Sequence, residues 1–314
     1  LHTAYRRQRQ MCIRDRHRTW IARRNGAFTM NSVTNAMRAH ILTAAVPYIK
    51  QYTDKYVVVK YGGNAMTDPE LKKSVMNDLL LLQLVGVKVV LVHGGGPDIN
   101  STLKAMNIES KFSNGLRVTD KETMNVVQMV LAGKVNKGLV ADLISFGGRA
   151  IGLCGVDGEL IQVHKKNEEL GYVGEVDTID PKVIDDVISK GYIPVISSVG
   201  CDAEGNVYNV NADTAAAKIA GALNAETMVA MTNIDGVLRD VNDPNSLISK
   251  ITLAEAEQLK KEGVIAGGMI PKVDCCLEAI NAGAQKVFII NGEIPHAILI
   301  ELLTDEGLGT MFVK

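Results

Sequence analysis

Short apolar runs alternate with segments of helical periodicity along most of the chain. Residues 56–61 form a β-branched run that ends at a glycine pair, and residues 68–85 follow a helical period. A second apolar run, 87–92, ends at three glycines. Two strands joined by a helix of this length predict a βαβ unit, and therefore a parallel sheet that is covered on both faces.

The same alternation continues toward the C-terminal end. Further helices are predicted at 121–145, 181–190, 212–222, 253–261 and 269–281, followed by a short closing helix. Further strands are predicted at 150–154, 193–197, 226–231 and 286–290. The polar, glycine-containing segment 157–177 predicts a β-hairpin outside the main sheet. The pattern therefore predicts an α/β protein with a mainly parallel central sheet.

An amphipathic arm, residues 30–51, precedes the first strand. Apolar residues recur at helical spacing from Val33 to Tyr48, and Pro47 is expected to kink or end the helix because it lacks an N–H group. The apolar face of this arm has two possible partners, its own domain or another subunit, and the sequence leaves both open. A soft boundary near residue 224 divides the rest into lobes 52–224 and 225–314.

Residues 1–29 differ from the rest in composition, with eight arginines and one acidic residue. An arginine-rich, acid-poor leader resembles an organellar transit peptide. The letters QMCIRDR also resemble a translated sequencing adapter joined to a gene fragment, in which case Met30 is the true start. In either case we expect this segment to be disordered and to carry no chemistry.

Composition excludes several classes of function. Outside residues 1–29 there are 26 basic and 34 acidic groups, so no basic stripe follows a phosphate backbone, and the aromatic content of 4% disfavours base stacking. No uninterrupted apolar run reaches the roughly 18 residues of a membrane span. The five cysteines are scattered without C-x-x-C spacing, which predicts neither a disulfide framework nor a zinc site and favours the cytoplasm. We expect neither a nucleic-acid partner nor a membrane partner.

Glycine turns supply the first chemical signal. Gly62–Gly63 and Gly94–Gly96 directly follow predicted parallel strands, and ligands of open α/β sheets bind at the carboxyl ends of strands. Glycine lets backbone N–H groups approach an anion closely, and the N-terminus of a following helix adds a favourable dipole. Neither turn matches GxxxxGK[ST] or GxGxxG, so neither a P-loop nor a dinucleotide fingerprint is present. The turns therefore predict an anion site, with simple tight turns as the alternative.

Charged and amide side chains recur near such turns. Lys60 ends a buried apolar run, where an ammonium group is costly unless it meets an anion. Lys272 follows a glycine pair and Pro271 at a predicted helix start. The alternative for both lysines is a solvated surface position.

The segment Asn209, Asn211 and Asp213 precedes an alanine-rich helix and holds more polar groups than one N-cap requires. Arg117 lies in a glycine-flanked loop and suits bidentate binding of a carboxylate. Ordinary helix capping for the first group and solvation for Arg117 are the alternatives.

Five ordered motifs resemble those of the acetylglutamate kinase branch of the amino-acid kinase family. They are KYGGNAM at 60–66, HGGGP at 93–97, GLRVT at 115–119, NVNAD at 209–213 and GGMIPK at 267–272. The resemblance runs from about Val33 to the C-terminal end. It implies a three-layer α/β/α sandwich, ATP and Mg²⁺, and N-acetyl-L-glutamate as the acceptor. The implied product is N-acetylglutamyl 5-phosphate, in the second step of arginine biosynthesis.

The resemblance also implies a role for each matching residue. Lys60 and Lys272 would bind the phosphates, and Asp213 would hold both lysines. The transferred phosphoryl group would be cradled by N–H groups of Gly62, Gly63, Gly95 and Gly96. Arg117 would bind the substrate α-carboxylate, and Asn209 and Asn211 the acetamido group. The nucleotide would contact Thr232, Asn233, Asp235, Gly236, Gly268 and Met269. No protein metal site is implied, because Mg²⁺ would be held mainly through the ATP phosphates.

The arm and the C-terminal tail resemble the arginine-inhibited, hexameric type of this family. The resemblance implies a dimer, or a hexamer built as a trimer of dimers, inhibited by L-arginine. The candidate arginine contacts are Tyr48, His296, Glu306 and Gly309, and a PII-type signalling protein is a possible partner. The plain alternative is a tail that only ends the last strand.

Three other functions remain as alternatives. The first is another amino-acid kinase, such as glutamate 5-kinase, carbamate kinase or aspartokinase. The second is a catalytically silent arginine-sensing module, against which the retained lysines and Asp213 argue. The third is a Rossmann oxidoreductase, which the missing fingerprint disfavours.

Overall fold

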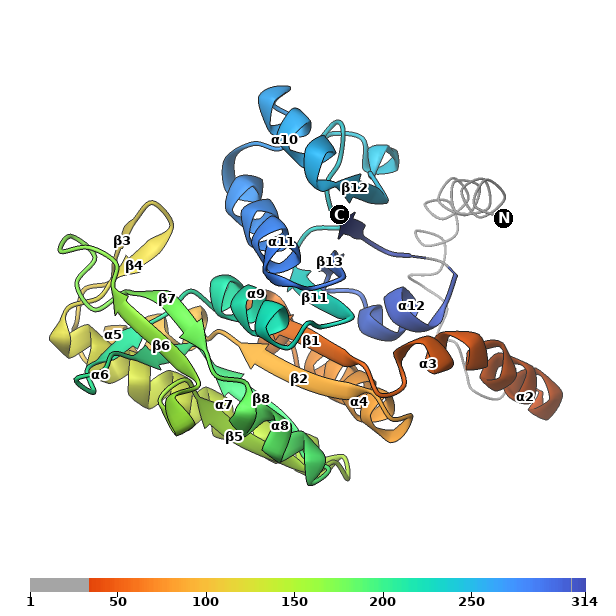
Figure 1. Ribbon diagram of the computed structural model, residues 1–314, viewed down its shortest axis with the longest axis horizontal. Helices are drawn as coiled ribbons and strands as arrows, with labels where there is room; N and C mark the ends of the chain where they lie inside the picture. Colours follow the sequence, from red (N-terminus) through yellow and green to blue (C-terminus); the bar gives the residue numbers. More distant parts are fainter. Residues whose placement is uncertain (1–33, 306) are drawn as a thin grey trace.

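A large, mainly parallel sheet forms the centre of the protein, with helices on both faces (Figure 1). The computed structural model describes residues 34–305 and 307–314. The expectations for residues 1–29, for Val33 and for Glu306 lie outside this range. The sheet has eight strands in the order β12-β14-β13-β11-β1-β2-β8-β5, and β14 is antiparallel to β13 while the other pairs are parallel. The predicted α/β class and the mainly parallel sheet are confirmed.

Six of the eight sheet strands match the predicted apolar runs to within one residue, namely β1 (Tyr56–Tyr61), β2 (Lys88–His93), β5 (Ala150–Cys154), β8 (Ile193–Ser197), β11 (Thr227–Thr232) and β13 (Lys286–Asn291). The other two, β12 (Lys250–Thr252) and β14 (Thr310–Val313), were not predicted. Residues on successive positions of a strand point to opposite faces. In β1, Val58 packs into one core cluster while Val57 and Val59 pack into the other.

Different helices cover the two faces. The Val58 face is covered by α8 (Lys182–Ser189), α9 (Ala212–Ala222), α10 (Leu253–Lys261) and α11 (Ile270–Ala282). The opposite face is covered by α3 (Val46–Tyr52), α4 (Pro69–Leu84), α5 (Gly96–Ala105), α6 (Lys121–Gln128), α7 (Asn136–Ser145) and α12 (Ala297–Leu303). This is the expected three-layer sandwich. None of the helices in residues 34–305 and 307–314 is long and apolar enough to cross a membrane.

Small strands lie outside the large sheet. The predicted hairpin is present as β6 (Ile161–Lys165) and β7 (Gly174–Ile179), and two short strands that the sequence did not indicate, β9 (Val199–Cys201) and β10 (Val207–Asn209), extend it to four. A second hairpin, β3 (Lys111–Ser113) and β4 (Leu116–Val118), carries Arg117. The predicted loop around Arg117 is therefore wrong, because its glycine makes a hairpin turn.

The predicted helix 121–145 is confirmed as an unbroken helical stretch, but its middle part is not α-helical. Between α6 and α7 the chain forms a π-helical segment, Met129–Val135. The wider turn changes the face on which the following residues lie. As a result Leu131 and Val135 pack onto Gly95, and Asn136 is buried. Periodicity alone did not indicate this π-helical segment.

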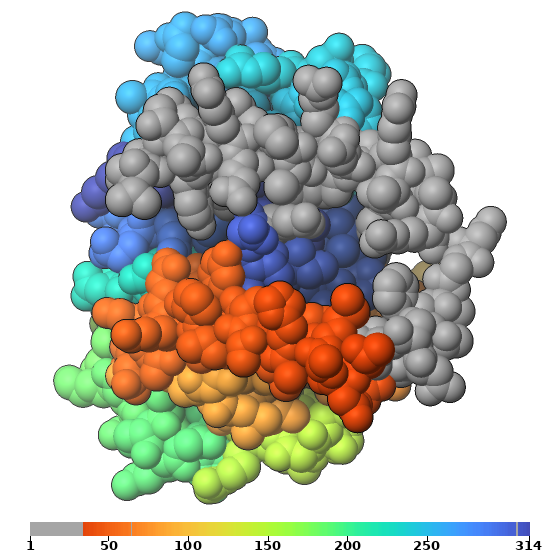
Figure 2. Space-filling view, turned by 90° about the vertical axis from the view of Figure 1, so that its right-hand side faces the viewer, coloured from red at the N-terminus to blue at the C-terminus, as the bar shows by residue number. Residues whose placement is uncertain are grey.

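The arm consists of α2 (Asn35–Ala44) and α3, and Pro47 lies in the first turn of α3, so the predicted break is confirmed. No residue of α2 is buried, and its apolar residues Met37, Ile41 and Leu42 are 56%, 57% and 71% exposed. Figure 2 shows the arm at the surface, between the C-terminal part of the chain and the residues that follow the first strand. Within residues 34–305 and 307–314, α2 buries no apolar residue against the rest of the protein.

Candidate active site

The two glycine turns lie side by side at the carboxyl edge of the large sheet. The last residues of β1 and β2 pair with each other, so both turns begin at the same level. Helix α5 starts at Gly96, with Gly95 as its N-cap residue. In the part of the chain that the structure describes, no acceptor receives the N–H group of Gly95 or Gly96. Two unpaired backbone donors at a helix N-terminus favour an anion.

A cavity of about 160 Å³ opens onto these glycines. An engineered cavity of about 150 Å³ accepts benzene, so this space suits a small metabolite rather than a whole nucleotide. Its lining includes the predicted residues Gly95, Gly96, Arg117, Asn209 and Asn211. It also includes residues that the sequence analysis missed, namely Ile99, Leu131, Val173 and Ser198. These four are ordinary apolar or small residues, and their only sequence signal is proximity to a motif or a strand end.

Arg117 is a buried cation at the wall of this cavity. The residue is only 7% exposed, and burial lowers the pKa of its guanidinium. Nη1 donates to Ser110 Oγ, Nη2 donates to Asn100 Oδ1 over 2.7 Å, and the guanidinium lies 4.7 Å from the Phe112 ring centroid. All three partners are neutral, and no salt bridge joins Arg117 to a carboxylate among the described residues. A buried guanidinium without a counter-ion favours an anionic ligand.

The two asparagines differ in their surroundings. Asn211 is the N-cap of α9, and its Oδ1 accepts from the N–H groups of Asp213 and Thr214. Helix capping, the plainer alternative, is therefore correct for the oxygen of Asn211. Asn209 ends β10, and its Nδ2 donates to Thr119 Oγ1 over 3.3 Å. Both residues still line the cavity, so capping does not exclude contact of the Asn211 amide nitrogen with a ligand.

Lys60 meets a carboxylate beside the cavity. Its Nζ lies 2.9 Å from Asp213 Oδ1, and the two side chains are 12% and 26% exposed. A Cβ atom at Gly62 would lie 3.4 Å from Lys60 Nζ, so this glycine faces the ammonium group. The predicted link between Lys60 and Asp213 is present, and it accounts for a lysine at the end of a buried strand.

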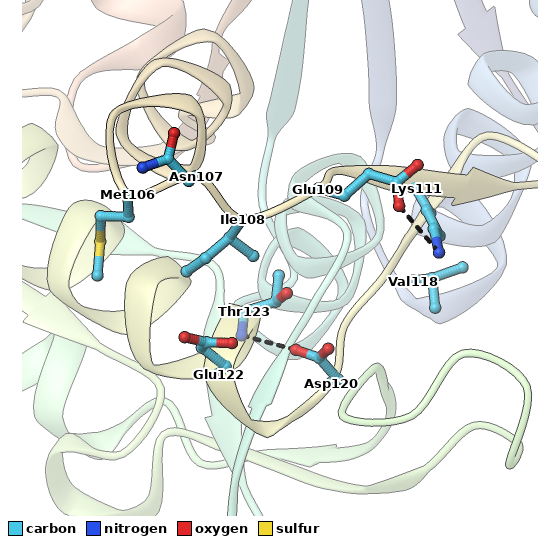
Figure 3. A pocket seen from close by; sticks show the side chains of 9 residues that line it. All are labelled: Met106, Asn107, Ile108, Glu109, Lys111, Val118, Asp120, Glu122 and Thr123. Carbon is cyan, nitrogen blue, oxygen red and sulfur yellow. Dashed lines mark hydrogen bonds and ion pairs between the residues drawn. The ribbon is translucent and has the colours of Figure 1, made fainter.

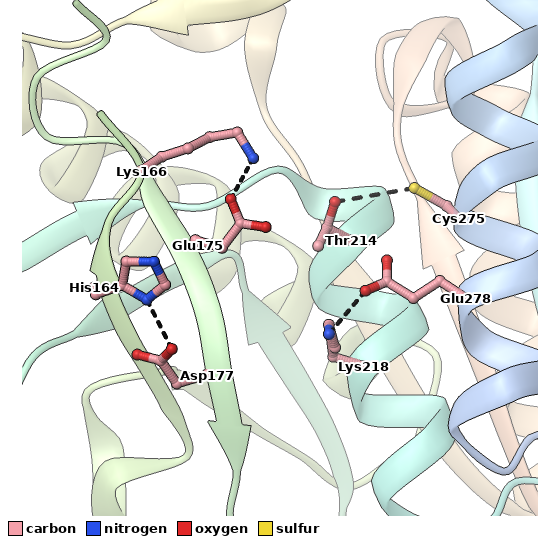
Figure 4. Close-up of polar contacts among 8 residues, drawn as sticks. All are labelled: His164, Lys166, Glu175, Asp177, Thr214, Lys218, Cys275 and Glu278. Atoms are coloured by element: carbon pink, nitrogen blue, oxygen red, sulfur yellow. Dashed lines mark hydrogen bonds and ion pairs between the residues drawn. The ribbon is translucent and has the colours of Figure 1, made fainter. Parts of the chain in front are cut away.

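Lys272 lies in the first turn of α11, which packs along α9. Contacts between these helices include Thr214 Oγ1 to Cys275 Sγ at 3.9 Å and Lys218 Nζ to Glu278 Oε1 at 2.8 Å (Figure 4). Burial raises the pKa of the Cys276 thiol, the Asp213 carboxylate raises it further, and the Lys272 ammonium lowers it. The charges of Asp213 and Lys272 therefore both act on the same buried thiol of α11. No ion pair with Asp213 is formed by Lys272 within the described residues, unlike the expectation that Asp213 holds both lysines.

The candidate nucleotide residues lie at the same edge of the sheet, beyond Lys60. Thr232 ends β11, the neighbour of β1, and its Oγ1 accepts from the Ile234 N–H. Asn291 Nδ2 donates to Asp235 Oδ1 over 2.8 Å. Asn233 and Gly236 belong to the same loop, while Gly268 and Met269 form the turn that enters α11.

The candidate arginine contacts lie apart from the cavity, around α12. His296 Nδ1 donates to Asp78 Oδ1 over 2.6 Å, and burial raises the pKa of that carboxyl. Gly309 donates its N–H to Glu301 Oε2 over 3.1 Å. Tyr48 is part of α3, which packs beside α12 (Figure 1). The structure thus brings the elements of Tyr48 and His296 together.

A second, larger cavity of about 320 Å³ is lined in part by Lys111 and Val118 of the hairpin that carries Arg117 (Figure 3). Glu109 pairs with Lys111 over 3.1 Å, and Asp120 Oδ1 accepts from the Thr123 N–H at the start of α6. This hydrogen bond lowers the pKa of Asp120. Glu109, Lys111 and Asp120 therefore have local partners.

Comparison with known proteins gives consistent relatives. The model of the amino acid kinase family matches residues 55–291. An acetylglutamate kinase of Brachyspira hyodysenteriae is 54% identical over 287 residues, covering 91% of this chain and 100% of the relative. That of Thermosynechococcus vestitus is 50% identical over 282 residues, covering 90% and 96%.

Solved structures agree in fold. The N-acetylglutamate synthase of Neisseria gonorrhoeae, complexed with coenzyme A and N-acetyl-glutamate, matches with a TM-score of 0.77 and 25% identity, covering 88% of this chain and 63% of that chain. Carbamate kinase from Giardia lamblia bound to AMP-PNP matches with a TM-score of 0.60 and 18% identity, covering 83% and 98%, a likeness of fold alone.

Proposed function

The chain belongs to the amino-acid kinase family, and we propose that it transfers the γ-phosphoryl group of ATP to the side-chain carboxylate of N-acetyl-L-glutamate. The product is N-acetylglutamyl 5-phosphate, in the second step of arginine biosynthesis. The observation that carries the proposal is the buried Arg117, which has no counter-ion among the described residues. It lies in a small cavity that is also lined by Gly95 and Gly96, whose N–H groups have no acceptor in that part of the chain. One cavity thus offers a binding group for the α-carboxylate and donors for a phosphoryl group.

The chemistry needs charge stabilisation and positioning rather than a general base. A carboxylate oxygen of the acceptor attacks the γ-phosphorus, an O–P bond forms, and the bond to the β-phosphate oxygen breaks as ADP leaves. The acceptor is ionised at neutral pH, so no proton has to be removed. Phosphoryl transfer depends mainly on alignment and on neutralising developing charge. In this proposal Lys60, Lys272 and the glycine N–H donors supply both, and Asp213 orients Lys60.

Mg²⁺ fits this site mainly as a partner of the nucleotide. No group of three or more His, Cys, Asp or Glu that could hold a metal ion occurs within residues 34–305 and 307–314. Mg²⁺ is commonly bound by one or two carboxylates plus substrate phosphates, and it neutralises phosphate charge when bound. Asp213 is a carboxylate that pairs with Lys60, one of the two lysines proposed to bind the phosphates. The protein residues would therefore position the nucleotide that carries the ion.

A coupled assay of ADP release with different acceptors tests the proposal. We expect turnover with N-acetyl-L-glutamate and little with glutamate, aspartate, or bicarbonate plus ammonia. Apolar Leu131 and the amide of Asn209 both line the cavity, and an apolar group together with a hydrogen-bonding group suits an acylated substrate. Faster turnover with glutamate or aspartate would move the chain to another branch of the family. No turnover with any acceptor would favour the arginine-sensing alternative.

Replacing Arg117 by lysine is expected to raise the KM for N-acetyl-L-glutamate about tenfold or more, with a smaller change in kcat. An ammonium group cannot reproduce the planar fork, and a hydrogen bond to a charged group contributes about 1.5–3 kcal/mol. Steady-state kinetics at saturating ATP measures the effect. Arg149, which lies 4.2 Å from the Tyr192 ring centroid outside the cavity, gives the matched control, Arg149→Lys. An unchanged KM in Arg117→Lys would remove Arg117 from the substrate site.

We also propose feedback inhibition by L-arginine and assembly through the arm. The exposed apolar face of α2 supports contact with a second copy, since such residues are normally covered. Tyr48, His296, Glu306 and Gly309 are the candidate inhibitor contacts, and the packing of α3 beside α12 supports coupling between the arm and that site. Binding of a PII-type protein and a cytoplasmic location stay predictions.

Deleting residues 30–50 is expected to leave active dimers with weakened arginine inhibition. Light scattering and inhibition curves measure both effects. The point variant Ile41→Glu, which keeps α3, should also prevent hexamers, whereas His40→Glu on the same exposed helix should not. Hexamers that persist after the deletion would contradict the proposed assembly.

A further inference from the structure

His93 is fully buried directly before the glycine turn, and its two ring nitrogens have fixed partners. Nδ1 lies 2.8 Å from the carbonyl oxygen of Gly94, which can only accept, so Nδ1 carries the proton. Nε2 lies 3.1 Å from Nδ2 of the buried Asn136, which can only donate. The ring is therefore neutral, and burial lowers its pKa to about 4.

Asn136 is held in this orientation by the backbone. Its Nδ2 also lies 2.8 Å from the Val195 carbonyl and 3.1 Å from the Leu153 carbonyl, while its Oδ1 is buried and has no hydrogen-bond partner among the described residues. A flipped amide would set its oxygen against two carbonyl oxygens, so the orientation is fixed. The amide group contributes through its NH₂ end, which keeps the His93 Nε2 free of a proton.

The His93 contact decides which way a catalytic donor points. In a planar trans peptide the carbonyl of Gly94 and the N–H of Gly95 point in opposite directions. The Gly94 carbonyl is directed at His93, and the Gly94 N–H is bound to the Tyr61 carbonyl over 3.1 Å. The Gly95 N–H therefore points away from the imidazole, and Gly95 lines the cavity.

We infer that His93 and Asn136 are positioning residues. They fix the Gly94–Gly95 peptide so that the N–H group of Gly95 points at the phosphoryl group during its transfer. The inference rests on the proposed function. A reversed peptide would present a carbonyl oxygen to an anion and remove one donor. Loss of one such donor typically lowers kcat about 10²–10³-fold. Neither residue touches the substrate in this arrangement.

Matched variants of His93 test the inference, because loss of a donor that acts only in the transition state should lower kcat and leave the two KM values nearly unchanged. His93→Leu should lower kcat about 10²-fold and change both KM values less than about threefold. Affinity for MgADP with aluminium fluoride and N-acetyl-L-glutamate should fall with kcat, while affinity for MgADP alone should not. His93→Asn, whose Nδ2 can replace Nδ1 as donor to Gly94, should recover at least about tenfold of the lost kcat.

Two further measurements separate positioning from folding. Ser197→Ala removes a fully buried polar group from the same sheet edge and should keep wild-type kcat. In the unmodified enzyme, long-range ¹H–¹⁵N spectra should show neutral His93 protonated at Nδ1, which requires no variant. The inference fails if Nε2 carries the proton, if His93→Asn is no better than His93→Leu, or if Ser197→Ala loses as much kcat. An unmodified enzyme without activity toward N-acetyl-L-glutamate would instead overturn the proposed function.

Discussion

Replacing Lys60 or Lys272 by alanine is expected to lower kcat at least about 10²-fold, up to about 10³-fold, with the fold intact. Each ammonium group is proposed to neutralise charge on the phosphates, and Lys60 is already aligned by Asp213 at 2.9 Å. Water that fills the space of the lost side chain cannot supply a fixed positive charge. Initial rates of ADP release at saturating substrates measure the loss, and circular dichroism checks folding.

A lysine at the opposite end of the sheet provides the control for Lys60. Lys286 pairs with Glu226 over 3.3 Å, and the two side chains are 14% and 24% exposed, close to the values for Lys60 and Asp213. Lys286→Ala should therefore have a similar effect on stability and none on turnover. Lys60→Ala combined with Asp213→Asn should remain slow, because the missing cation and not the unpaired carboxylate causes the loss. Near-normal turnover in either lysine variant would refute the role of that lysine.

The regular elements could be predicted because their apolar residues follow the period of a strand or helix. Strand 56–61 and helix 212–222 match the observed bounds of β1 and α9. Elements held by tertiary contacts could not be predicted in the same way. The three-residue strands β9, β10 and β12 are too short to show a period, and the π-helical segment depends on packing of Leu131 against Gly95.

The site was predictable as a set of residues but not as an arrangement. Motif resemblance named Arg117, yet its burial and its neutral partners Asn100 and Ser110 follow only from the folded hairpin. Capping by Asn211 was indicated by residue type alone. No role could be assigned to His93 from the sequence, because its significance lies in contact with Asn136, 43 positions later in the chain. The lobe boundary near residue 224 stays a prediction.

Replacing Gly221 by alanine is expected to lower both stability and activity, although Gly221 lies at the end of α9 that is far from the proposed phosphate-binding lysines. A Cβ atom at Gly221 in α9 would overlap the Cβ of Ala282 in α11 and lie 3.2 Å from the Ala282 carbonyl. The two helices would have to separate, at a cost of about 1–3 kcal/mol in the free energy of unfolding. Asp213 and Lys272 lie at the other ends of these same helices, so their separation changes. A misplacement of about 1 Å can reduce activity about 10²-fold.

Exchanging the two side chains distinguishes this mechanism from general destabilisation. Gly221→Ala with Ala282→Gly restores the number of methyl groups between the helices, so kcat/KM should recover most of its loss. Full recovery of stability is not expected, because a helical glycine costs about 1 kcal/mol and the 3.2 Å backbone contact remains. Gly138→Ala is the control, because no atom of the described residues lies within 4 Å of the Cβ that it adds to α7, and it should leave activity unchanged. Wild-type kcat/KM in Gly221→Ala would mean that the α9–α11 contact does not set the position of Lys272. In that case the first turn of α11 must be positioned by contacts other than its packing on α9.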